Sequence, residues 1–192
     1  MNNLAIFSSG TGSNAARIIQ YFQGHPSISI RLIVCNNPRA GVLDVAATAA
    51  IPVLLIEKEQ FFRGSAYIPE LQAGNIDFIV LAGFLWKIPA KLVQAYRHRI
   101  VNIHPALLPA YGGKGMYGHH VHEAVIAAGE KESGITIHYV DELYDHGQAI
   151  FQAKVAVEPD DTPVTLAKKI RFLEHNHFPR VIEEAIHLSN HR

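Results

Sequence analysis

The chain has 192 residues, which is enough for one domain with a full hydrophobic core. Hydrophobic residues make up 48% and charged residues 18%, so the composition excludes a disordered chain. Seventeen basic side chains balance seventeen acidic ones, so the chain has no net charge that would attract it to nucleic acid or to a membrane surface. We therefore expect neither as a partner. An anionic ligand must therefore be held by a local site.

The amino terminus has only a short apolar run, without a basic region, which excludes a signal peptide and a membrane anchor. No later apolar run approaches the roughly 20 residues that a membrane-spanning helix needs. The single Cys35 cannot form an internal disulfide, which suits a reducing compartment. We therefore expect a soluble cytoplasmic protein.

Short apolar or alternating segments predict seven strands. They span residues 4–8, 30–35, 53–56, 77–81, 100–104, 134–140 and 149–155. Helices are predicted between and after them, at residues 15–22, 41–50, 67–74, 89–96, 121–128 and from about 161 onward. Pro179 is expected to kink or split the last helix, because proline has no N–H to donate. The alternation predicts an α/β fold, an open and mostly parallel twisted sheet with helices on both faces.

Ligands of such sheets bind at the carboxyl ends of the strands, where residues 9–14, 83–88 and 102–105 fall. The first segment, Ser9-Gly-Thr-Gly-Ser-Asn14, joins a strand to a helix and suits a phosphate, because glycines allow close approach and the helix start offers free N–H groups. The pattern formally matches a dinucleotide fingerprint, but Asn36 and Asn37 stand where an acidic residue is expected. The Gly-Lys-Ser/Thr of an ATP loop is also missing. A tight turn in which Ser13 or Asn14 merely caps the helix stays open.

Asn102 and His104 lie two residues apart at a strand end, so their side chains point to the same side. An amide donor beside an imidazole can stabilise a tetrahedral oxyanion and manage the proton of an attacking amine. Asp141, Glu142 and Asp145 supply carboxylates that could orient the imidazole. A purely structural histidine at this strand end is the alternative.

Five segments together carry a family resemblance. They are Ser9-Gly-Thr-Gly-Ser-Asn14, Leu81-Ala-Gly-Phe84, Asn102-Ile-His-Pro-Ala-Leu-Leu-Pro109, Asp145-His-Gly147 and Leu173-Glu-His175. With them the chain resembles the folate-dependent phosphoribosylglycinamide formyltransferases of purine synthesis, which have a Rossmann-like fold, along nearly its whole length. The third segment with its later Asp is shared by several formyltetrahydrofolate enzymes, so it identifies the chemistry more than the acceptor. The glycine loop and the Glu-His pair favour the ribonucleotide branch.

The resemblance implies transfer of the formyl group of 10-formyltetrahydrofolate to the amine of glycinamide ribonucleotide, giving formylglycinamide ribonucleotide and tetrahydrofolate. It implies catalysis by three residues, Asn102, His104 and Asp145. For the ribonucleotide it implies contacts from Gly12, Ser13, Asn14, His120, Arg171 and Glu174. An ion pair between Arg171 and Glu174, three apart on a helix, is the alternative for those two.

For the folate, the resemblance implies a pterin cleft formed by Leu85, Trp86, Ile88 and Val140, with core or rim packing as the alternative. His138 is implied as a support of the site, or else as a structural histidine of its strand. The folate is a co-substrate, and no metal is required.

The chain departs from the family after Pro109, where residues 110–118 are longer and glycine-rich. A loop of this kind beside an active site is typical of a mobile lid, in which Lys114 could supply the basic charge missing at Ala110. His119, His120 and His122 follow directly. A zinc site would need further ligands, so we predict none.

Related enzymes are the main competing functions. We expect a single domain over residues 1–192, with a nucleotide-binding half at about 1–100 and a catalytic, folate-binding half at about 101–192. This leaves no room for the tRNA-binding domain of methionyl-tRNA formyltransferases or for the regulatory domain of formyltetrahydrofolate deformylases. The glycine loop disfavours sugar-nucleotide formyltransferases. A catalytically silent nucleotide-binding module gives no reason for Asn102, His104 and Asp145 to occur together.

Overall fold

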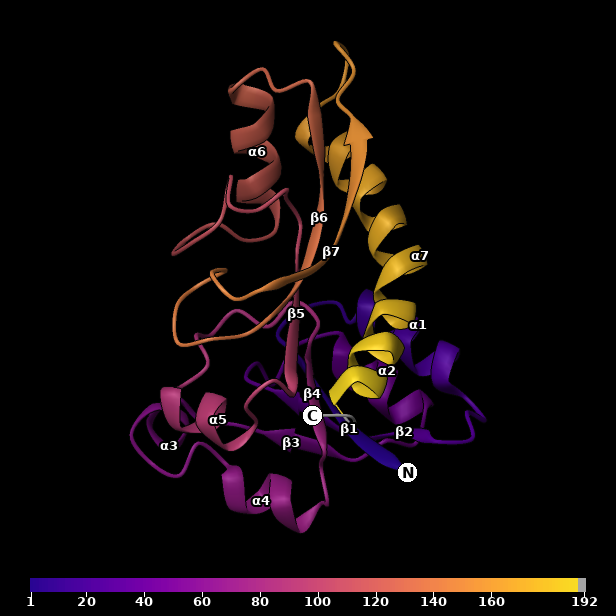
Figure 1. Ribbon diagram of the computed structural model, residues 1–192, viewed down its shortest axis with the longest axis vertical. Helices are drawn as coiled ribbons and strands as arrows, with labels where there is room; N and C mark the ends of the chain where they lie inside the picture. Colours follow the sequence, from indigo (N-terminus) through magenta and orange to yellow (C-terminus); the bar gives the residue numbers. More distant parts are fainter. Residues whose placement is uncertain (190–192) are drawn as a thin grey trace.

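One seven-stranded sheet organises the computed structural model, which describes residues 1–189 (Figure 1). The strand order is β3-β2-β1-β4-β5-β6-β7, in which the first five strands are parallel and β6 and β7 are antiparallel. The strands are β1 Asn2–Ser8, β2 Ile28–Cys35, β3 Val53–Leu55, β4 Phe78–Leu81, β5 Ile100–His104, β6 Glu132–Tyr139 and β7 Ala149–Ala156. The predicted mostly parallel α/β sheet is confirmed.

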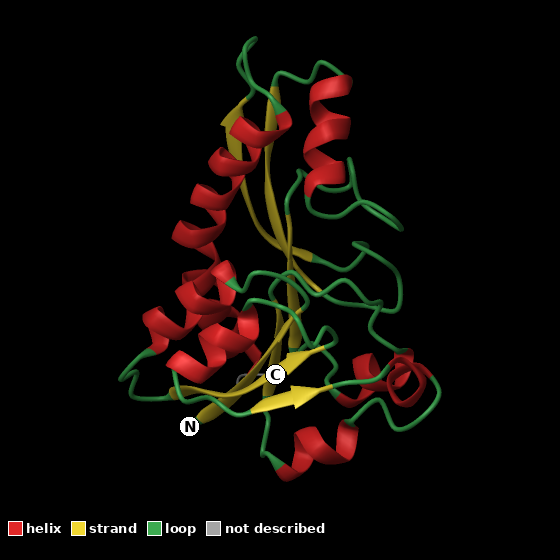
Figure 2. Ribbon diagram, turned by 180° about the vertical axis from the view of Figure 1, so that it is seen from behind, coloured by secondary structure: helices red, strands yellow, loops and turns green. Residues whose placement is uncertain are grey.

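Helices cover both faces of the sheet. They are α1 Ser13–Phe22, α2 Val42–Thr48, α3 Lys58–Phe62, α4 Ile68–Ala73, α5 Ala90–Ala95, α6 His119–Ala127 and α7 Pro163–Ser189. Figures 1 and 2 show α3, α4 and α5 grouped together, apart from α1, α2 and α7. Alternate residues of β1 enter two separate cores, Leu4 with the α1–α7 side and Ala5 with the α3–α5 side. Burial on both faces explains why the central strands β1, β4 and β5 carry apolar runs.

The predicted strands are all present, with ends that move by one or two residues. The sequence prediction missed α3, a five-residue helix that has only Phe61 fully buried. Such a short segment shows no apolar periodicity to detect. Among residues 1–189 no helix is both long and apolar enough for a membrane span.

The terminal helix α7 runs without a break through Pro179, so of the predicted kink or split the split was wrong. Proline leaves the carbonyl four residues earlier, that of His175, without its helical donor. Arg17 of α1 donates to that carbonyl from Nε at 3.2 Å, which replaces the missing bond. The helix begins as predicted, because the Thr165 N–H donates to the Thr162 hydroxyl oxygen at 3.2 Å in a capping bond.

The fold brings distant segments to one edge of the sheet. The β1–α1 loop, the β4–α5 loop and the end of β5 meet there, because the carboxyl ends of parallel strands share an edge. The antiparallel register of β5 and β6 places His138 opposite Asn102. The loop between β6 and β7 carries Asp145 back to the same edge.

Gly12 shows how tightly the first loop is built. Its φ of 79° lies in the left-handed region, and an added Cβ would lie 2.7 Å from the Cα of Val42. We expect Gly12→Ala to lower the free energy of unfolding by about 1–3 kcal/mol. Gly10→Ala is the matched control, because nothing lies within 4 Å of a Cβ at that position. Urea denaturation of both variants checks this, and equal losses would contradict it.

Candidate active site

A cavity of about 670 Å³ opens at the carboxyl edge of the sheet. A volume of this size suits small-molecule substrates. Of the residues that sequence reasoning selected, those that line it are Gly12, Ser13, Asn14, Leu85, Asn102, His104, Asp145, Arg171 and Glu174. Trp86, Ile88, His120, His138 and Val140 are not among the lining residues.

His104 is held at both ring nitrogens. Its side chain is almost fully buried, with Nε2 2.8 Å from the carbonyl oxygen of Tyr111 and Nδ1 3.5 Å from Asp145 Oδ2. A carbonyl oxygen only accepts hydrogen bonds, so this network assigns a proton to Nε2. Nδ1, facing the carboxylate, is therefore the atom that can gain or lose a proton.

Burial and charge act in opposite directions on this pair. Burial lowers the pKa of His104 below its ordinary value, although the Asp145 carboxylate and the Tyr111 carbonyl raise it in part. For Asp145 burial acts to raise the pKa, but His138, His104 and the Gly113 amide outweigh it, so its pKa lies below the ordinary value. Asp145 is therefore a carboxylate at neutral pH, and its charge favours the protonated form of the His104 ring, which burial disfavours.

His138 orients the amide of Asn102. The Nδ1 atom of His138 lies 2.8 Å from the carbonyl oxygen of Tyr139, which assigns the proton to Nδ1. Its Nε2 lies 3.1 Å from Asn102 Nδ2 and 3.7 Å from Asp145 Oδ1. The amide group is thereby fixed with Nδ2 toward His138, which leaves its second N–H for another acceptor. His138 supports Asn102 from outside the cavity lining.

The segment after Pro109 is attached directly to the acid–base pair. Gly113 donates its backbone N–H to Asp145 Oδ2 at 2.9 Å, and the Tyr111 hydroxyl donates to Glu130 at 2.7 Å. Tyr111 and Asp145 have φ values of 55° and 50°, in the left-handed region. Strained residues of this kind persist where the surroundings determine their conformation. Sequence reasoning missed Tyr111 and Gly113, because backbone groups leave no signal in residue type.

The glycine loop ends at the start of α1, which carries no side-chain cap. Within residues 1–189 the Asn14 side chain instead donates from Nδ2 to Glu174 Oε2 at 2.9 Å, so the capping alternative does not describe it. The uncapped N–H groups and the positive end of the helix dipole face the cavity, an arrangement suited to an anion.

Arg171 and Glu174 reach the cavity from α7. No ion pair joins them in the described part of the chain, which removes the alternative of a simple i, i+3 pair. Burial raises the pKa of Glu174, and the Asn14 hydrogen bond and the Arg171 charge offset part of the rise.

The four residues expected to contact the pterin do not gather at the cavity. Leu85 lines it and is half exposed. Ile88 is buried, and Trp86 and Val140 pack against the same α3–α5 core. The Trp86 ring centre lies 5.7 Å from that of Phe61. Which of these four residues contact the pterin stays a prediction.

His122 is a candidate that sequence reasoning passed over in favour of His120. It is 6% exposed and lines the cavity, and its Nδ1 has no hydrogen-bond partner among residues 1–189. Burial lowers the pKa of His122, and the charge of Arg171 lowers it further. The signal was helical spacing, because His122 lies between Val121 and Val125 on the buried face of α6.

The site combines an amide donor, an imidazole and a carboxylate at the edge of an α/β sheet, next to an uncapped helix start. This is the arrangement of a group-transfer enzyme. The formyl transferase family description matches residues 2–182, and the chain belongs to that family.

Individual relatives are similar over most of the chain. A phosphoribosylglycinamide formyltransferase of Bacillus subtilis is 36% identical, with 99% of this chain and 97% of that protein covered. The chloroplastic phosphoribosylglycinamide formyltransferase of Arabidopsis thaliana is 42% identical over 93% of this chain. This chain spans 63% of the Arabidopsis protein and 59% of its Vigna unguiculata counterpart. A crystal structure of the Bacillus halodurans phosphoribosylglycinamide formyltransferase superposes with a TM-score of 0.87 at 38% identity, covering 95% of this chain and 94% of that one.

The geometry predicts how the pair titrates. Asp145→Asn removes the negative charge that raises the pKa of His104, so that pKa should fall further below its ordinary value. NMR titration of the histidine ring signals measures this. The signal of His175 is an internal control, because its pKa is lowered by burial and two arginines and not by Asp145. An unchanged or raised pKa of His104 would contradict the geometry.

Proposed function

We propose that this protein transfers the formyl group of 10-formyltetrahydrofolate to the amine of glycinamide ribonucleotide, giving formylglycinamide ribonucleotide and tetrahydrofolate. The observation that carries the proposal is one cavity with two chemically different parts. Asn102, His104 and Asp145 lie in one part, and the uncapped start of α1 with Arg171 and Glu174 lies in the other. The folate is a dissociable co-substrate, and the transfer needs no metal. The cytoplasmic location stays a prediction, since two plant relatives are named as chloroplastic.

In the proposed mechanism the amine nitrogen attacks the formyl carbon and forms a new C–N bond. The negative charge that develops on the formyl oxygen is stabilised by the free N–H of Asn102 and by a protonated Nδ1 of His104. Asp145 supports that imidazolium by its charge. A proton passes from the attacking nitrogen to the leaving nitrogen of the folate, whose bond to carbon then breaks. Losing one such oxyanion donor costs roughly 2.7–4 kcal/mol in the barrier.

In the ribonucleotide part, Gly12, Ser13 and Asn14 would receive the phosphate on backbone N–H groups, with Arg171 neutralising its charge. Glu174, oriented by Asn14, would accept hydrogen bonds from the ribose hydroxyls. The expected division at about residue 100 then assigns the phosphate loop to the first half. The second half supplies the catalytic residues as well as Arg171 and Glu174.

The direct test supplies the purified protein with both substrates and measures the two products. Formation of formylglycinamide ribonucleotide together with tetrahydrofolate is the expected result. Release of formate without an acceptor would instead indicate a deformylase, and transfer only to an amino-sugar nucleotide would indicate that branch. Either outcome would refute glycinamide ribonucleotide as the acceptor, although the protein would still act on 10-formyltetrahydrofolate.

Arg171→Ala separates the two substrate sites. It removes a charge-assisted contact worth roughly 1.5–3 kcal/mol, so the KM for the ribonucleotide should rise by about 10- to 100-fold. The KM for the folate should change little. Arg180→Ala is the matched control, because Arg180 is on the same helix, pairs with Glu184 and is not among the lining residues. A raised folate KM with an unchanged ribonucleotide KM would show that the two sites are reversed.

A further inference from the structure

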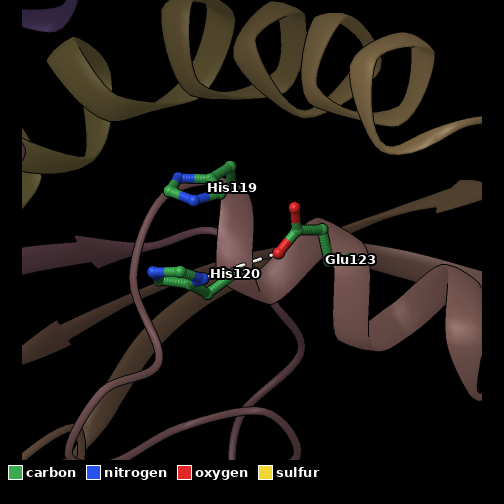
Figure 3. A group of neighbouring side chains, drawn as sticks. All are labelled: His119, His120 and Glu123. Atoms are coloured by element: carbon green, nitrogen blue, oxygen red, sulfur yellow. Dashed lines mark ion pairs between the residues drawn. The ribbon is translucent and has the colours of Figure 1, made fainter.

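Three potential metal ligands gather on the first turn of α6, outside the proposed catalytic residues. One ligand atom each from His119, His120 and Glu123 lies within 4.8 Å of the others. Figure 3 shows the two imidazole rings above one another, with the Glu123 carboxylate beside His120. The ring centres are 3.9 Å apart, and His120 Nδ1 lies 3.5 Å from Glu123 Oε2. The spacing i, i+1, i+4 puts all three at one end of one helix.

The donor set is selective. Two imidazole nitrogens with one carboxylate oxygen suit zinc and similar divalent transition metals, and a three-ligand zinc site keeps a fourth position open. Bonds of roughly 2.0–2.2 Å require the ligand atoms to move closer together than they are now. The side chains of His120 and Glu123 are 45% and 56% exposed, so they can rotate, and only a weak surface ion pair is lost.

The cluster borders the proposed acceptor site. His119 and Tyr117 line the cavity together with Arg171 and Glu174, and the Tyr117 ring packs edge-on against His120 at 5.2 Å. His119 also begins the helix directly after the glycine-rich segment. An ion held here would fix the end of that segment to α6 and so restrict Tyr117 and His119 at the rim of the cavity.

We propose that His119, His120 and Glu123 form a binding site for a divalent transition metal, with Zn²⁺ as the best fit, and that its occupancy inhibits the enzyme. The metal takes no part in the transfer reaction. It hinders the acceptor by holding Tyr117 and His119 at the rim of the cavity. The inhibition of formyl transfer rests on the proposed function, whereas the binding of Zn²⁺ does not.

Calorimetric titration of the metal-free protein with Zn²⁺ tests the binding. We expect one Zn²⁺ site per chain. His119→Gln and Glu123→Gln should each weaken it by at least about 10-fold, since even outer-shell partners of metal sites are worth 10–100-fold. His187→Gln is the matched control, an exposed histidine that pairs with a glutamate one helical turn away. Equal Zn²⁺ affinity in all four proteins would overturn the site.

Formyl-transfer kinetics test the inhibition. Zn²⁺ should raise the KM for the ribonucleotide but not that for the folate, and Glu123→Gln should remove this effect while keeping the metal-free turnover. Inhibition that persists in Glu123→Gln would overturn the regulatory role, as would activity that a chelator abolishes and Zn²⁺ restores. A metal-free protein that binds Zn²⁺ as expected but transfers no formyl group would leave the site standing and refute the proposed function.

Discussion

The site depends on one carboxylate held between two imidazole rings. Asp145 has an exposed side-chain fraction of 12%, and its two oxygens lie 3.5 Å from His104 Nδ1 and 3.7 Å from His138 Nε2. Burying a charge is costly unless it is paired and hydrogen-bonded, and the Gly113 amide supplies the bond. The carboxylate thereby links the histidine of β5, the histidine of β6 and the segment after Pro109. The other contacts of the site keep these three parts in place.

The change from parallel to antiparallel pairing between β5 and β6 makes this arrangement possible. In the antiparallel register Asn102 faces His138, and the short connection to β7 returns to the same edge with Asp145. If β7 ran parallel to β6, the connection between them would have to be a long crossover. The five parallel strands supply the anion-binding start of α1, and the antiparallel pair supplies the acid–base group.

The sequence predicted those features of the fold and the site that depend on residue type and spacing. Asn102 and His104 were predicted to share a side because strands alternate, and apolar or alternating runs predicted each strand. Other features depend on tertiary contacts. Arg17 lets α7 continue through Pro179, and the carbonyl of Tyr111 fixes the tautomer of His104. His120 was selected as a ribonucleotide contact, although helical spacing places His122 on the buried face of α6. Trp86 packs against the α3–α5 core, and residue type alone does not distinguish such packing from a binding cleft.

Turnover and thermal melting, measured on the same preparations of His104 variants, test the central claim most directly. If His104 stabilises charge that appears only in the transition state, His104→Ala should lower turnover by about 100-fold or more. Because His104 is buried, His104→Gln is measured beside it, since a Gln amide can still donate to the Tyr111 carbonyl and preserve the fold. Both variants should be folded and have greatly reduced turnover. Near-wild-type turnover in either folded variant would contradict it.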